Sequence, residues 1–193
     1  MKKKNSYELK HYRKLLHLLS GIIAIFYYFF SYKEEIFIYI IWLIVCSILM
    51  LDAIRLLFSK INDFIYKYLN HLFIDREKNR INSASYYFCG ILFCIYFLPV
   101  EIAVSSMLFL SFGDTFASFI GIHFGKHKIS KKKTFEGSLA CFLICFLLAI
   151  LFLPFHISLI GAIIATLSEL IPWSLDDNLT IPIFSGISMT LIY

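Results

Sequence analysis

Seven apolar runs follow one another along this chain, and they limit what it can fold into more than any other feature. The runs are Leu15–Phe30, Ile36–Leu51, Ala84–Leu98, Ile102–Ile122, Leu139–Leu153, Ile157–Ile171 and Leu179–Tyr193. A helix that crosses a bilayer unaided needs about 20 apolar residues, and several runs are shorter. Local thinning of the bilayer or partner helices can accommodate short spans. We therefore predict an all-α integral membrane protein with about seven transmembrane helices, or six if one run is re-entrant.

Composition excludes a soluble protein. Of the 193 residues, 60% are hydrophobic, and mean hydropathy is +0.78. Soluble domains average about 45–50% apolar residues. The net charge of +5 gathers between the runs, where it suits anionic lipid headgroups or nucleotide phosphates better than nucleic acid. One polytopic domain over residues 1–193 is the natural organisation.

The basic residues indicate how the helices are oriented. Seventeen of the 18 lysines and arginines lie before the first run, between the second and third, or between the fourth and fifth. Only Lys33 lies on the opposite side. Because positive loops stay on the cytoplasmic side, we predict a cytoplasmic N-terminus and an external C-terminus, as in a bacterial-type inner or plasma membrane.

The linker from Asp52 to Asn82 is predicted to hold an amphipathic helix on the cytoplasmic face. Its apolar residues recur at helical spacing: Ile54, Leu57, Ile61, Phe64, Ile65, Tyr68, Leu69 and Leu72. That pattern is typical of a helix lying in the membrane interface. We expect it to be structural, or to act as a cover that faces the lipid.

The stretch Gly113–Ser138 contains the strongest functional signal. Asp114 lies inside an apolar run, about 10 Å deep at roughly 1.5 Å per residue, and five lysines follow within Lys126–Lys133. A buried carboxylate needs a cation, a metal or a proton. A structural pair with a lysine or arginine is one interpretation, and a metal-binding or catalytic role is the one we favour.

Two of the five lysines are placed to bind phosphate. Lys126 follows Gly125, and Lys133 precedes Thr134, so both adjoin turn-like backbone. The other three are explained by topology and lipid attraction. A helix beginning near Gly137 is expected to offer free N–H groups and a positive dipole end to an anion.

Two further polar clusters should reach the same side. Asp177-Asn178 precedes the last run and is either a capped turn or a pair of oxygen ligands for a divalent metal. Arg13 and His17 share one face of the first helix. Arg13 is expected to contact phosphate, oriented by Glu8, or else to reach the interface as a snorkelling side chain.

Other patterns in the central stretch are weaker. His123 and His127 are four residues apart, but two histidines without a third ligand favour an interfacial pair over a metal site. Gly121 and Gly125 form a G-x-x-x-G spacing that indicates close helix packing. The stretch matches neither a P-loop nor a dinucleotide fingerprint.

Taken together, these residues resemble the dolichol kinase/phytol kinase family of membrane enzymes, which includes CTP-dependent diacylglycerol kinases. The matching blocks are Glu8 with Arg13-Lys14-Leu15-Leu16-His17 and Gly21, then Gly113-Asp114-Thr115-Phe116-Ala117-Ser118 with Gly121, Gly125 and Lys126, then Lys133-Thr134-Phe135-Glu136-Gly137-Ser138, and finally Asp177-Asn178-Leu179-Thr180-Ile181-Pro182. The likeness runs from Glu8 to the end of the chain. His123 departs from it, because relatives often have Arg or Lys at that position.

The resemblance implies transfer of the γ-phosphoryl group of a nucleoside triphosphate, typically CTP, to the hydroxyl of a polyprenol, a phytol-like alcohol or diacylglycerol. Asp114 and Asp177 would be catalytic and, with Asn178, would hold Mg²⁺. The expected phosphate-binding residues are Arg13, Lys14, Lys126, Lys133, Thr134, Gly137 and Ser138. The expected supporting residues are Glu8, His17, Gly113, Thr115, Gly121, Gly125 and Glu136.

Two other functions stay open on the sequence. A phosphatidate cytidylyltransferase-like enzyme also uses CTP and a metal ion, but it would release pyrophosphate instead of CDP. A small transporter would spread its polar residues through both leaflets, whereas here they gather on one side.

Overall fold

The computed structural model describes residues 2–30, 34–69, 78–130, 133–171 and 175–193. Within these ranges the secondary structure is helical, apart from an isolated bridge between Lys128 and Thr134. The elements are α1 (Lys2–Phe30), α2 (Glu34–Leu57), α3 (Ser59–Leu69), α4 (Ser83–Phe97), α5 (Val100–Leu108), the π-helical turn η3 (Phe109–Gly113), α6 (Asp114–His123), α7 (Phe135–Ala149), α8 (Phe155–Leu170) and α9 (Asp177–Thr190). Each of the seven apolar runs overlaps a helix, so the all-α prediction is confirmed.

The helix ends follow local chemistry. Pro99 and Pro154 stand at the N-caps of α5 and α8, where a missing N–H costs nothing. Asn82, Thr134 and Asp176 cap α4, α7 and α9 with a side-chain oxygen, which satisfies an otherwise unpaired N–H group.

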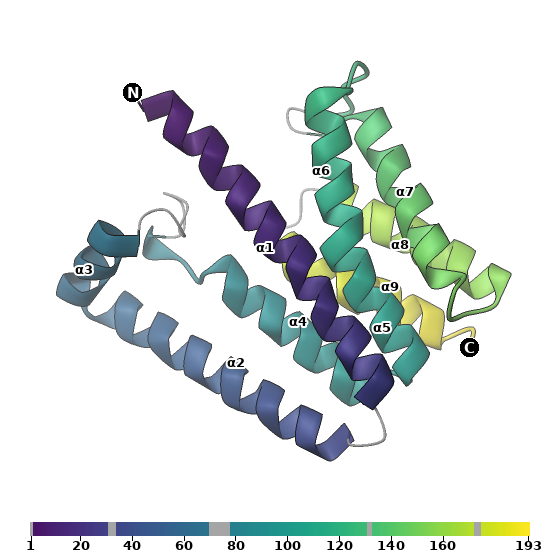
Figure 1. Ribbon diagram of the computed structural model, residues 1–193, viewed down its shortest axis with the longest axis horizontal. Helices are drawn as coiled ribbons and strands as arrows, with labels where there is room; N and C mark the ends of the chain where they lie inside the picture. The colour runs from purple at the N-terminus through teal and green to yellow at the C-terminus, as the bar shows by residue number, and fades with distance from the viewer. Residues whose placement is uncertain (1, 31–33, 70–77, 131–132, 172–174) are drawn as a thin grey trace.

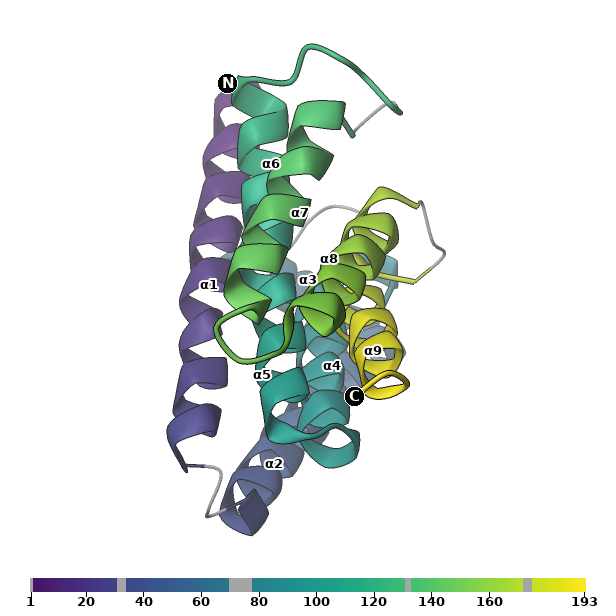
Figure 2. The same ribbon diagram turned by 90° about the vertical axis from the view of Figure 1, so that its right-hand side faces the viewer.

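The centre of the fold is the unbroken helix formed by α5, η3 and α6. Residues 102–111 of this helix are all buried. Helix α1 runs alongside it, and α7, α8 and α9 pack against η3 from the other side (Figure 2). Helix α2 lies on the outside of α4 (Figure 1). The π-turn shifts the register of the central helix where α6 begins, as π-turns at functional sites often do.

The outer surface is strongly apolar. Leu43, Leu57, Leu151 and Phe97 are each at least 65% exposed, and many other large apolar side chains face outward. A water-soluble monomer rarely has such a surface, so the fold suits the interior of a bilayer. Two helical segments of the described residues, Ile38–Leu57 and Val100–His123, are long and apolar enough to cross a membrane. The other apolar helices are shorter.

The linker predicted to be amphipathic contains a helix, α3, within the described residues. Ile54 and Leu57 belong to α2, and α3 contains the amphipathic part from Ile61 to Leu69. Leu72 lies outside the described residues. In Figure 1 the N-terminus and the end of α6 both lie at the top of the molecule.

Candidate active site

The first half of the site lies between α1 and the start of α6. The Lys14 ammonium is 3.9 Å from the Asp114 carboxylate and donates at 3.4 Å to the Asp114 backbone carbonyl. Asp114 is the first residue of α6, directly after the π-turn. At 3.9 Å the carboxylate is not fully engaged by Lys14, so it has acceptor capacity left for a ligand.

His17 lies one turn further along α1 and makes a T-shaped contact with the Tyr87 ring, with ring centroids 5.2 Å apart. Its Nε2 atom is buried and lacks a hydrogen-bond partner within the described part of the chain. The Asp114 carboxylate is within electrostatic range of His17 and of Lys133. The side chains of Glu8 and Arg13 lie outside the described residues.

The second half of the site is centred on Lys133. Its ammonium donates to Glu169 at the end of α8, and also to Asp177 at the start of α9 at 3.3 Å. Burial lowers the pKa of Lys133, but the carboxylates of Glu169 and Asp177 outweigh that effect and hold it above its ordinary value. Lys133 is therefore a positive charge that joins the ends of two helices.

Glu169 is the site residue that the sequence analysis missed. Its side chain is 4% exposed, and the oxygen not bonded to Lys133 has no partner among the described residues. A charged residue inside an apolar run was the signal that singled out Asp114. The same signal applies to Glu169 in the run Ile157–Ile171 and could have found it.

Asp177 begins α9, but its neighbours have structural tasks. Asp176 caps the helix by accepting from the Asn178 N–H at 3.2 Å. The Asn178 side-chain amide donates to the Ser83 carbonyl at 3.1 Å. Burial raises the pKa of Asp177 to about 6, against the attraction of Lys133 and with added repulsion from Asp114. The segment is therefore a capped turn, as one interpretation predicts. Asp177 itself contacts Lys133 of the charged cluster.

The turn before α7 corrects one prediction. Helix α7 begins at Phe135, two residues before Gly137, and the Gly137 N–H is not free, because it donates at 3.2 Å to the hydroxyl of the N-cap Thr134. The Ser138 N–H donates to the Thr134 carbonyl at 3.0 Å. These two N–H groups are occupied by the cap, so they are not free to bind phosphate. The Ser138 hydroxyl is buried and has no partner in the described structure.

The glycines of this region allow two helices to approach closely. A Cβ atom on Gly137 would lie 2.6 Å from the Ala117 carbonyl oxygen and 3.3 Å from the Gly121 Cα. A Cβ on Gly121 would lie 3.0 Å from the Thr134 hydroxyl, and one on Gly125 would collide with the Gly121 carbonyl. The packing interpretation of the G-x-x-x-G spacing is confirmed. This crossing of α6 and α7 holds Lys133 near the site.

A second anchor of the loop is Glu136, which accepts from the His127 ring at 2.7 Å and from the His127 backbone N–H at 3.2 Å. His123 bonds instead to the Phe119 carbonyl, so the two histidines have separate partners. Lys126 is exposed at the start of this loop.

Two other predicted supporting residues lie at the π-turn. Gly113 packs closely against Cys145, and the Thr115 hydroxyl donates to the Ser111 carbonyl. Both residues shape the π-turn.

The donor set fits Mg²⁺ only if waters and substrate phosphates complete the coordination shell. Among the described residues no three His, Cys, Asp or Glu side chains stand close enough to hold a metal ion together. Mg²⁺ commonly uses one or two carboxylates and completes its shell with waters and substrate phosphates. Asp177 and Asp114 carry oxygens of this type, and one Glu169 oxygen is buried without a partner among the described residues.

Comparison with known proteins finds several relatives of this chain. The chain is 32% identical over 200 residues to CTP-dependent diacylglycerol kinase 1 of Schizosaccharomyces pombe, and the match covers 93% of this chain and 92% of that protein. It is 28% identical over 213 residues to CTP-dependent diacylglycerol kinase 1 of Saccharomyces cerevisiae, covering 72% of that protein. It is 25% identical over 203 residues to the probable phytol kinase 2 of Glycine max, covering 65% of it. No protein-family model and no solved structure matches.

Proposed function

Because the chain belongs to the family of lipid kinases that includes CTP-dependent diacylglycerol kinase and phytol kinase, we propose that it transfers the γ-phosphoryl group of CTP to the hydroxyl of a membrane lipid alcohol. The observation that supports this best is the position of Lys133 between Glu169 and Asp177, within electrostatic range of Asp114, which pairs with Lys14. Phosphoryl transfer needs such a set of positioned charges more than it needs covalent chemistry.

We further propose that the protein is one domain with seven membrane spans and a cytoplasmic N-terminus. The site then opens on the cytoplasmic side of a bacterial-type inner or plasma membrane, where CTP is available. The distribution of lysines and arginines supports this orientation. The exposed apolar side chains around the bundle support a lipid environment.

The lysines, Arg13 and the two aspartates have the following roles in the proposed reaction. Lys133 and Lys14 bind the phosphate oxygens, with Arg13 and the exposed Lys126 at the entrance. Asp177 would hold Mg²⁺, which would supply positive charge to neutralise the phosphates, and Asp114 is the base in this scheme. The Ser138 hydroxyl, which is buried and unpaired, is a further donor for a phosphate oxygen. Asn178 supports Asp177 through its bond to Ser83.

The proton of the lipid hydroxyl goes to Asp114 in this scheme. As that proton leaves, the oxygen forms a bond to the γ-phosphorus, and the bond from that phosphorus to the bridging oxygen breaks. CDP departs with the electron pair. Asp114 suits this role because it lies within the apolar helix Val100–His123, at the depth that a lipid hydroxyl can reach, and because Lys14 engages it only loosely.

The proposal is tested with purified protein, radiolabelled CTP and a lipid alcohol in detergent micelles. Asp114→Asn and Lys133→Ala should each lower turnover by at least about a hundredfold, since each removes a charge that the transition state needs. Lys128→Ala, at an exposed lysine of the same loop, is the matched control and should retain parental turnover. Near-parental activity in both site variants would reject the assignment.

A screen of lipid alcohols identifies the acceptor. Diacylglycerol, phytol and a polyprenol are offered with each of four nucleoside triphosphates, and nucleoside diphosphate release is followed. Diacylglycerol is the first acceptor to test, because two of the relatives above are named diacylglycerol kinases. Release of CDP supports the proposed kinase, whereas release of pyrophosphate would indicate cytidylyl transfer.

A further inference from the structure

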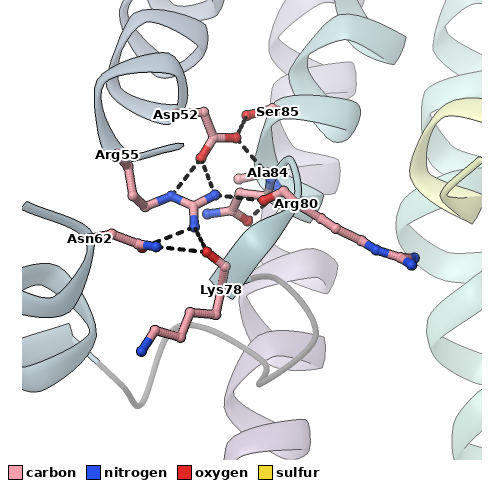
Figure 3. Close-up of polar contacts among 8 residues, drawn as sticks. Asp52, Arg55, Asn62, Lys78, Arg80, Ala84 and Ser85 are labelled. Atoms are coloured by element: carbon pink, nitrogen blue, oxygen red, sulfur yellow. Dashed lines mark hydrogen bonds and ion pairs between the residues drawn. The ribbon is translucent and has the colours of Figure 1, made fainter. Parts of the chain in front are cut away.

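A buried arginine lies at the junction of α2, α3 and α4, away from the charged cluster of the site. Arg55 is 2% exposed, and all five N–H bonds of its guanidinium point to acceptors (Figure 3). It donates twice to Asp52 at 2.8 and 3.1 Å, to Asn62 at 3.4 Å, and to the carbonyls of Lys78 at 3.2 Å and Arg80 at 2.7 Å. We call this group the Asp52–Arg55 clasp.

The clasp fixes the chain that leads into α4. The second carboxylate oxygen of Asp52 accepts from the Asn82 N–H at 2.8 Å and from the Ser85 hydroxyl at 2.6 Å. The Asn62 amide donates to the Lys78 carbonyl at 2.8 Å. These contacts hold the segment before α4 at three points, so the first turn of α4 has little freedom.

The first turn of α4 in turn holds the first turn of α9. The Ser83 hydroxyl donates to the Asp176 carboxylate at 3.2 Å, and the Ser83 carbonyl accepts from the Asn178 amide at 3.1 Å. Gly90 permits this approach, since a Cβ there would lie 2.8 Å from the Asn178 carbonyl. Asp177 lies between the two residues that Ser83 contacts.

A buried ion pair of this kind is not explained by stability alone. Taking two charges out of water costs energy that their attraction often only balances, and well-packed apolar side chains can replace them. What the pair supplies that apolar residues cannot is a fixed set of directional bonds. A lysine at position 55 could not reproduce the five bonds of the planar guanidinium.

We propose that Asp52 and Arg55 are positioning residues for Asp177, acting through Asn82 and Ser83. This inference rests on the proposed function, in which Asp177 binds the metal–nucleotide complex. The clasp fixes the start of α4, α4 fixes the start of α9, and the Asp177 carboxylate is thereby held toward Lys133. Loosening the clasp should impair nucleotide binding although no member of the clasp contacts Lys133 in the described structure.

The experiment uses the full chain in detergent and three variants. Arg55→Lys keeps the charge but loses the fork of bonds. Ser83→Ala leaves the clasp intact and removes only the hydroxyl that contacts Asp176. Asp63→Asn is the control, because it breaks an exposed ion pair with Lys78 at 2.9 Å in the same region.

Arg55→Lys and Ser83→Ala should each raise the KM for Mg²⁺·CTP by about tenfold, while the KM for the lipid alcohol stays within about twofold. Hydrogen exchange at residues 175–180 should become faster in both variants, and exchange in α8 should not change. The double variant should be no worse than Arg55→Lys, since both act on one path. Asp63→Asn should match the parent in all readouts.

The outcomes separate the two proposals. An inactive parent protein, with any lipid alcohol and nucleotide, rejects the proposed function. An active parent whose Ser83→Ala variant keeps parental KM and parental exchange at 175–180 rejects the positioning role, even if Arg55→Lys is unstable. Independent, additive effects of Arg55→Lys and Ser83→Ala also contradict it.

Discussion

The ammonium of Lys133 donates to the carboxylate of Glu169, and this bond links the loop before α7 to the buried end of α8. Residues 133 and 169 are far apart in sequence, so only the packing of α7 against α8 brings them together. The other Glu169 oxygen is buried without a partner in the described structure. Such an arrangement makes Glu169 the counter-ion that keeps Lys133 inside the bundle.

Replacing Glu169 by glutamine should weaken binding of Mg²⁺·CTP by at least about tenfold. Without the negative charge, Lys133 shifts toward Asp177 and competes with the metal ion for that carboxylate. Calorimetric titration with a non-hydrolysable CTP analogue and Mg²⁺ measures this. Glu101→Gln, at the first turn of α5, is the control for loss of one carboxylate. Parental affinity in the Glu169 variant would contradict the counter-ion role.

The raised pKa of Asp177 should make the metal-free protein less stable as pH rises. The folded-state pKa of about 6 exceeds the ordinary value of 3.8, so the folded protein binds more protons between these pH values. Stability therefore falls from about pH 4 to about pH 6. The fall is smaller than the roughly 3 kcal/mol that two pKa units represent, because 36% of the side chain is exposed.

Thermal unfolding in detergent with EDTA, measured at several pH values, tests this. The parent should lose melting temperature across that interval relative to Asp177→Asn, which has no charge to bury. Added Mg²⁺·CTP should remove the difference by stabilising the ionised form. Parallel curves for the parent and Asp177→Asn would show that Asp177 does not titrate in this range.

Gly137→Ala should destabilise the protein and reduce its activity together. The added methyl group would lie 2.6 Å from the Ala117 carbonyl, so α6 and α7 must separate, at a cost of about 1–3 kcal/mol. Lys133 would move with the start of α7. Leu139→Ala, at an exposed position of the same helix, is the control and should change little. The melting temperature and CTP turnover of both variants are compared, and a stable, active Gly137→Ala protein would contradict the tight crossing.

The sequence was sufficient for the helices and for the charged cluster except Glu169. Periodicity and apolar runs predict where helices form, and burial of an isolated charge identifies Asp114. Partner choice is different, because it depends on tertiary packing. The residues next to Glu169 in the sequence do not predict that Lys133 is its partner. The residues next to Arg55 do not predict that its five N–H groups all find acceptors.

The cap of α7 shows a second limit of local patterns. The sequence predicts a helix that begins near Gly137 with free N–H groups, and α7 begins two residues earlier, at Phe135, with the Gly137 N–H already bonded. Thr134 is itself a good N-cap, and its hydroxyl accepts a hydrogen bond from the Gly137 N–H. The difference matters chemically, because an N–H bonded within a cap is not available to a phosphate oxygen.

Replacing Asp52 by alanine should destabilise the protein more than any surface charge change. The substitution leaves the buried Arg55 guanidinium without its carboxylate and leaves the Asn82 N–H and the Ser85 hydroxyl without an acceptor. Removing one partner of a buried pair typically costs about 3–5 kcal/mol. Asp63→Ala breaks an ion pair with Lys78 that is about half exposed on both sides and should cost less than about 1 kcal/mol. Chemical unfolding of both variants in matched micelles measures the two costs, and equal losses would mean that Arg55 finds other acceptors once Asp52 is gone.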